Sequence, residues 1–188
     1  LGLLSLFLQQ DGQGRPAPGR FGVCSLLSRL LVAGSQGVTD RGAREALLSL
    51  PSLQVFDYPN TGAVLSCLCR EDRVVQLQLT CLHCSPEEEL DLAACVSACP
   101  RLAHLHLATQ LGLEDSLLAL LDLEELVELK MCDESGQYCL PVSRHLRPVF
   151  QRHGATLVYL ALAEVREVEV GLLAALCPAL RHLALLWN

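Results

Sequence analysis

The feature that most constrains the fold of this chain is a leucine pattern that returns along its whole length. The clearest copy is CPALRHLALLWN, residues 177–188, where three leucines and Asn188 have the spacing L-x-x-L-x-L-x-x-N. Copies of the pattern begin at Leu1, Leu27, Leu53, Val74, Leu102, Leu126, Leu157 and Leu180. The average step is about 26 residues, and a short unit at such a period is typical of proteins built by stacking similar units.

Each copy has three slots whose side chains would point inward, and all of these slots hold apolar or aromatic residues. Alternate residues of a strand point to opposite faces of a sheet. The second and third apolar residues of each copy would therefore enter the core, and the residues between them would face solvent. The middle copies supply Leu53, Phe56 and Tyr58, then Val74, Leu77 and Leu79, then Leu102, Leu105 and Leu107, then Leu126, Leu129 and Met131.

Helical patterns separate the predicted strands. Thr39 is a candidate N-cap for a helix over 40–48, and Ser85-Pro86 followed by three glutamates is typical of a helix start. Further helices are predicted near 63–70, 114–121, 142–153 and 167–177. Strand and helix alternating at this short period predict an α/β solenoid, with parallel strands on its concave face and helices on its convex face.

A cysteine-containing version of the pattern, Cys-Pro-x-Leu-x-x-Leu-x-Leu, occurs at 99–107 and again at 177–185. Together with VTDRG at 38–42, it resembles the repeats of F-box/leucine-rich repeat proteins and of the antagonist of mitotic exit network family. The first group are substrate-recognition subunits of cullin-based ubiquitin ligases. The resemblance implies a leucine-rich repeat horseshoe, and the eight copies of the pattern predict about eight irregular repeats in a single domain over 1–188. Because a solenoid needs polar capping units and the chain starts and ends on repeat strands, we expect it to be a fragment of a longer chain.

Two departures from that family leave an alternative open. The sequence shows no F-box pattern, and the position after each predicted strand lacks a regular Asn or Cys ladder. Ribonuclease-inhibitor-like repeats, as in cytosolic innate immune receptors, are the second candidate. Ubiquitin ligase components would be partners through flanking regions only in the first case.

Composition excludes several classes of function. A net charge of −7 without a clustered basic face disfavours nucleic-acid binding. No apolar stretch reaches the roughly 18 residues of a membrane span, so no membrane partner is predicted. The ten cysteines are scattered through the repeats and are interpreted as reduced thiols that pack like small apolar residues. This predicts a cytoplasmic or nuclear location.

Candidate chemistry is limited to two clusters. CLHC at 81–84, with Cys67 and Cys69 before it, could hold zinc, but core or turn cysteines are the preferred interpretation. His104 and His106 share one face of a strand without an evident third ligand, so surface histidines in a binding face are preferred over a metal site. No phosphate loop or nucleophile–base pattern is present. We therefore predict no enzyme, cofactor or metal.

The predicted function is protein–protein interaction through the concave face, either in a ubiquitin-ligase substrate receptor or in a cytosolic scaffold or sensor. Residues between the inward slots would line that face, and aromatic and Arg side chains are favoured as interface anchors. The predicted contact residues are Arg29, Gln76, Gln78, His104, His106, Glu128, Lys130, Tyr159, His182 and Trp187.

Overall fold

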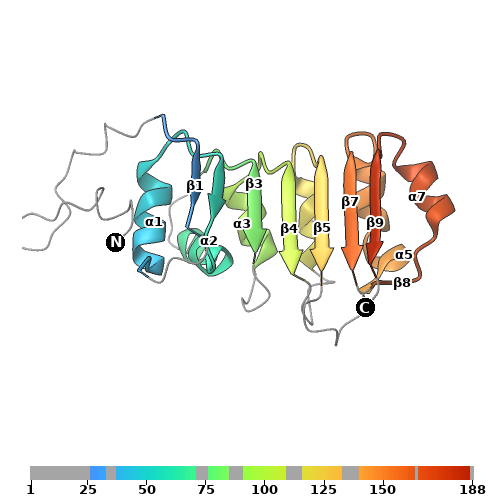
Figure 1. Cartoon of the computed structure of the whole chain (residues 1–188), viewed down its shortest axis with the longest axis horizontal. Coiled ribbons are helices and arrows are strands. Elements are labelled where there is room, and N and C mark those ends of the chain that lie inside the picture. The colour runs from blue at the N-terminus through green and yellow to red at the C-terminus, as the bar shows by residue number, and fades with distance from the viewer. Residues whose placement is uncertain are drawn as a thin grey trace, which may run out of the picture.

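The computed structural model describes residues 26–32, 37–70, 76–84, 91–108, 116–132, 140–163 and 165–186. Their main feature is a sheet of seven parallel strands, whose order in space is their order in the sequence (Figure 1). The strands are β1 (Arg29–Leu31), β2 (Val55–Asp57), β3 (Cys81–Cys84), β4 (His104–Ala108), β5 (Glu128–Cys132), β7 (Tyr159–Ala163) and β9 (His182–Leu186). The predicted α/β class with parallel strands is confirmed.

The helices that the structure describes lie between successive strands of this sheet. They are α1 (Asp40–Ser49), α2 (Thr61–Arg70), α3 (Leu92–Ala98), the 3₁₀ helix η3 (Leu117–Asp122), α5 (Val142–His145), α6 (Arg147–His153) and α7 (Val170–Leu176). Two short strands, β6 (Leu140–Pro141) and β8 (Val165–Arg166), form a separate parallel pair. The helical segment after each strand therefore returns the chain to the start of the next parallel strand, as parallel pairing requires.

Local sequence explains where the helices begin. Thr39 caps α1 as predicted, since its hydroxyl accepts a hydrogen bond of 3.2 Å from the backbone N–H of Gly42. Helix α3 is capped in the same way by Asp91, whose carboxylate accepts from the N–H of Ala94 at 2.9 Å. The predicted cap at Ser85 lies outside the described residues. Around 114–121, the described part forms η3 instead of an α-helix.

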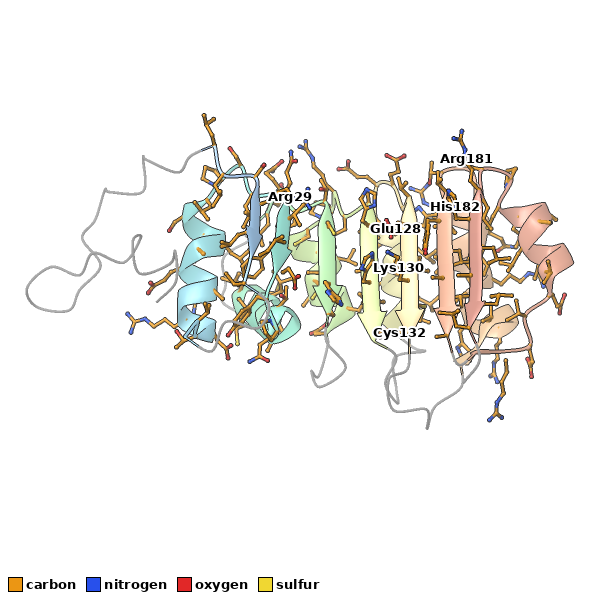
Figure 2. The ribbon with its side chains drawn as sticks, viewed as in Figure 1. Arg29, Glu128, Lys130, Cys132, Arg181 and His182 are labelled. Carbon is orange, nitrogen blue, oxygen red and sulfur yellow. The ribbon has the colours of Figure 1, made fainter. Side chains whose placement is uncertain are left out.

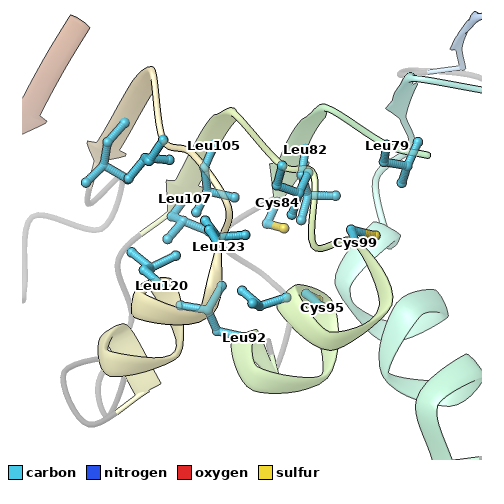
Figure 3. Close-up of a cluster of buried hydrophobic side chains, with 14 of the residues drawn as sticks. Leu79, Leu82, Cys84, Leu92, Cys95, Cys99, Leu105, Leu107, Leu120 and Leu123 are labelled. Carbon is cyan, nitrogen blue, oxygen red and sulfur yellow. The ribbon is translucent and has the colours of Figure 1, made fainter. Parts of the chain in front are cut away.

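The core lies between the strands and the helices, as Figure 3 shows for the middle of the sheet. Leu105 and Leu107 of β4 point into this layer and are buried there, and Leu92 of α3 and Leu120 of η3 approach from the other side. Full burial of one such side chain contributes about 1.5–3 kcal/mol. The register repeats the contact from strand to strand, because Leu82, Leu105, Leu129 and Leu160 are successive ladder partners.

The third strand is not where the leucine pattern was predicted to start. The stretch VVQLQLTCLHC at 74–84 contains two overlapping copies of the pattern, and the structure uses the one that begins at Leu79. Leu82 and Cys84 then fill the two inward slots and are buried. The backbone N–H groups of Thr80 and Cys81 donate to the carbonyl of Gln54, which fixes this register beside β2.

This shift corrects the predicted position of two residues, whereas their role as contact residues stays a prediction. Gln76 and Gln78 precede β3 instead of lying on it, and both side chains are exposed. The amide oxygen of Gln78 accepts a 2.8 Å hydrogen bond from the Arg101 guanidinium, which lies just before β4. The ladder positions that were assigned to the two glutamines belong to Cys81 and His83.

The open face of the sheet as candidate functional site

The face of the sheet opposite the helices is here named the open face. Figure 2 labels four of its side chains, Arg29, Glu128, Lys130 and His182. Its side chains alternate with the core-side residues along the strands and form two rows that cross all seven strands. The first row is Arg29, Val55, Cys81, His104, Glu128, Tyr159 and His182, and the second is Leu31, Asp57, His83, His106, Lys130, Ala161 and Ala184.

Glu128 is the centre of a charged cluster on this face. Its Oε2 accepts a 3.0 Å hydrogen bond from Nδ1–H of His104, and its Oε1 accepts a 3.1 Å bond from Nε2–H of His106. The Lys130 ammonium pairs with the same Oε1. A carboxylate only accepts, so both imidazoles must be donors at these atoms. Three side chains of the neighbouring strands β4 and β5 thereby contact one carboxylate, that of Glu128.

These contacts fix the ionisation of the cluster. Partial burial opposes the charge of Glu128, but the hydrogen bonds from Lys130, His104 and His106 outweigh it and hold the pKa of Glu128 at about 2. For His106, burial outweighs the hydrogen bond. Burial lowers the pKa of the His106 imidazole more than the bond to Glu128 raises it, and Lys130 adds to the lowering. At pH 7 the cluster therefore contains an ionised carboxylate and a neutral His106.

Aromatic rings extend this cluster in both directions. The Lys130 ammonium lies 4.9 Å from the ring centroid of Tyr159, a cation–π distance, and the Tyr159 and His182 rings are 5.8 Å apart. On the other side, the His83 and His106 rings meet edge to face at 5.6 Å. Nδ1 of His83 is 3.8 Å from Oδ1 of Asp57 on β2.

We name the whole set the polar strip. It crosses the sheet from β2 to β9 and consists of Asp57, His83, His104, His106, Glu128, Lys130, Tyr159 and His182.

The structure brings together six of the ten predicted contact residues in this strip, namely His104, His106, Glu128, Lys130, Tyr159 and His182. Arg29 lies exposed on the same face, on β1 at the far edge from Tyr159. Trp187 lies outside the described residues. His83, which lies beside His106 on this face, was not among the predicted contact residues. The copy of the leucine pattern that begins at Leu79 would have placed it beside His106.

The cysteines singled out in CLHC have different environments. Cys84 is buried on the core side of β3, whereas Cys81 is half-buried on the open face. Burial raises the pKa of the Cys99 thiol to about 12, and it also raises the pKa of Cys81 above its usual value. Among the residues that the structure describes, no group of three or more His, Cys, Asp or Glu side chains is arranged to hold a metal ion.

The open face contains a side chain that can be labelled selectively. Lys130 is the only lysine among the 188 residues. Its side chain is 36% exposed, so a reagent specific for side-chain amines would report on the polar strip alone.

Within the described ranges, none of the helices has the length and apolar content needed to cross a lipid bilayer. No family model, no curated protein and no solved structure matches the chain with significant similarity.

Proposed function

We propose that this chain is a leucine-rich repeat horseshoe that binds another protein through the open face of its sheet. The observation that carries the proposal is the polar strip itself. It places histidine, acidic, lysine and tyrosine side chains next to one another across six neighbouring strands. Tyr, Trp and Arg are the residue types enriched among interface anchors, and Tyr159 lies in the strip while Arg29 lies on the same face.

The backbone beneath the strip supports a binding role. In the middle of the sheet the strip residues alternate with buried side chains, for example His106 between Leu105 and Leu107, and Lys130 between Leu129 and Met131. Side chains held this way lose little further freedom when a partner docks, which lowers the entropic cost of association. Beside Tyr159 the face becomes small and apolar, with Ala161 and Ala184 as ladder partners. A partner side chain could pack against these two alanines.

The same geometry disfavours acid–base catalysis as the use of the cluster. A general acid or base works best when its pKa lies near the working pH. The pKa of Glu128 is instead about 2, because three donors already hold its carboxylate. Glu128 therefore serves as an anchor that orients His104, His106 and Lys130.

The cysteine-containing repeats favour the ubiquitin-ligase version of this function. In both copies, the cysteine is buried and ends a helix in the same way. The N–H of Cys99 donates to the carbonyl of Cys95, and that of Cys177 donates to Leu173. We propose a substrate receptor of a cullin-type ligase as the first candidate, and a cytosolic scaffold or sensor as the alternative that would use the same face.

The test is affinity purification of the protein from its own cells, with mass spectrometry of the bound proteins. It should be run on the unchanged protein, on Ala161→Arg and on Ala174→Arg. The first substitution places an arginine on the open face, and the second makes the same change on the exposed side of α7. We expect Ala161→Arg to lose a partner that Ala174→Arg retains. Equal recovery with both variants would contradict binding through the open face.

The proteins recovered then separate the two candidates. Cullin and its adaptor in the unchanged sample would identify a ligase subunit, and the proteins lost with Ala161→Arg would be its substrates. Another stable partner, without cullin or adaptor, would identify a scaffold or sensor.

A further inference from the structure

The open face differs in charge from the rest of the molecule. Its two rows contain two cationic residues, Arg29 and Lys130, and two anionic ones, Asp57 and Glu128, so the formal charge of the rows is zero. The whole chain carries −7. Four of its six histidines lie in the same two rows, namely His83, His104, His106 and His182. The open face is therefore where the described part of the molecule gains most positive charge when the pH falls.

We propose that the polar strip binds an acidic segment of a partner protein, and that binding tightens as the pH falls through the range in which histidines take up protons. This inference rests on the proposed function and names the chemistry of the partner. Charge complementarity is the reason for choosing an acidic segment.

The acidic side chains of the strip are already engaged. Glu128 accepts from His104, His106 and Lys130, and Asp57 lies 3.8 Å from the imidazole of His83. A basic partner would have to compete with these neighbours for the two carboxylates. An acidic partner meets donors instead, because the ammonium of Lys130 has three N–H groups and Arg29 is exposed on the other row of the same face.

Protonation adds donors at defined atoms. His104 donates to Glu128 through Nδ1, so a second proton would go to its Nε2. His106 donates through Nε2, so its second proton would go to Nδ1. Since Lys130 already balances the charge of Glu128, these two new positive charges have no counter-charge on β4 or β5 among the open-face rows. A partner carboxylate would supply one.

Proton uptake follows from the surroundings of each ring. His106 faces Glu128 and Lys130 on β5 and His83 on β3, and burial holds its pKa below the usual histidine value. His83 also faces Asp57 on β2, and His182 faces the Tyr159 ring on β7. A partner carboxylate beside the His106 ring would raise the pKa of that imidazole. Binding then takes up protons, and linkage requires the affinity to rise as the pH falls.

The test uses a rhodamine-labelled octapeptide of alternating glutamate and serine, with glutamine–serine and lysine–serine peptides as controls. Fluorescence anisotropy at low salt gives Kd at pH 7.5 and at pH 6.0. We expect the glutamate peptide to bind about threefold to thirtyfold more tightly at pH 6.0, the range for uptake of about 0.3 to 1 proton over that interval. Tighter binding of the lysine peptide, or no binding of the glutamate peptide at pH 6.0, would overturn the proposal.

Substitutions in the polar strip test whether it causes the pH dependence of peptide binding. The double variant His104→Gln/His106→Gln should lose most of the pH response, whereas His145→Gln, on α5, should keep it. Glu128→Gln should tighten binding at pH 7.5 and Lys130→Met should weaken it, with folding of each variant checked by circular dichroism. An unchanged pH response in the double variant, or reversed effects at Glu128 and Lys130, would contradict the assignment.

Failure of this inference is distinguishable from failure of the proposed function. A cellular partner that is lost with Ala161→Arg but binds with the same affinity at pH 7.5 and pH 6.0 keeps the proposed function and overturns the acidic segment. A partner retained by Ala161→Arg overturns the proposed function itself.

Discussion

The two faces of the same sheet differ in what their side chains contribute. On β4, Leu105 is 0% exposed and packs in the core, while the next residue, His106, lies on the open face and contacts Glu128. On β5, Leu129 and Lys130 repeat the contrast. One face supplies burial, which stabilises the fold, and the other supplies charge and aromatic surface. The pleat of the strand separates the two roles by a single residue.

The largest expected effect comes from truncating the buried face. Leu105→Ala should lower the free energy of unfolding by about 2–5 kcal/mol, because it leaves a cavity where Leu105 packs. His106→Ala, one residue away, should change the free energy of unfolding by less than about 1 kcal/mol and should weaken partner binding. Urea unfolding of both variants checks this. Equal losses of stability would show that the assignment of the two faces is wrong.

A second pair of variants tests how closely the layer of helices is packed. Gly154 follows α6, and a Cβ added there would lie 1.8 Å from the carbonyl oxygen of Leu176 in α7. Gly154→Ala should therefore cost about 1–3 kcal/mol, because backbone has to move. Gly171→Ala in α7 meets nothing within 4 Å and should be neutral or slightly stabilising. Thermal unfolding that lowers Tm equally for both would contradict this packing.

The next largest change in the free energy of unfolding is expected at a buried histidine. Nε2–H of His153 donates to the carbonyl of Leu120 at 2.8 Å, and the side chain is 2% exposed. His153→Leu should cost about 1–2 kcal/mol, because Leu120 loses a buried hydrogen bond.

The same histidine gives a pH dependence. Burial lowers the pKa of His153 in the fold, so below about pH 6.5 the unfolded chain binds a proton that the fold excludes. Its share of stability is complete above that pH and is lost as the pH falls. His153→Gln should reduce this loss between pH 7.5 and 5.5, as measured by urea midpoints at each pH. An unchanged slope would contradict a neutral buried His153.

The smallest expected effect concerns a helix start. Thr39→Ala should cost about 1 kcal/mol, because the hydroxyl that accepts from Gly42 is removed. Thr39→Ser keeps an acceptor at the same place and should retain most of the stability. Thermal unfolding of the two variants compares them, and identical losses would argue against the cap.

The sequence was sufficient to predict the sheet because its signal is periodic. Apolar residues at a fixed spacing fix both the strand and the face that it buries, as at Leu102, Leu105 and Leu107. The prediction was wrong at the third strand, where two copies of the pattern overlap. Cysteine in the last slot made the true copy look weaker, although a buried cysteine packs as a small apolar residue. Its more even spacing from the neighbouring copies was the signal that could have identified it.

The polar strip could be predicted only in part. Register places His104 beside Glu128 and His106 beside Lys130 once the strands are aligned. The sequence does not show that His106 reaches across to Glu128, because this diagonal contact depends on side-chain conformation. The position of Lys130 over the Tyr159 ring depends on it in the same way.

The most direct test of the central claim uses the single lysine. The chain is treated with an amine-reactive acetylating reagent, alone and in complex with the partner recovered from cells, and modification of Lys130 is quantified by mass spectrometry. If the partner binds the open face, Lys130 is modified in the free chain and protected in the complex. Equal modification of Lys130 in both samples would contradict binding at the polar strip.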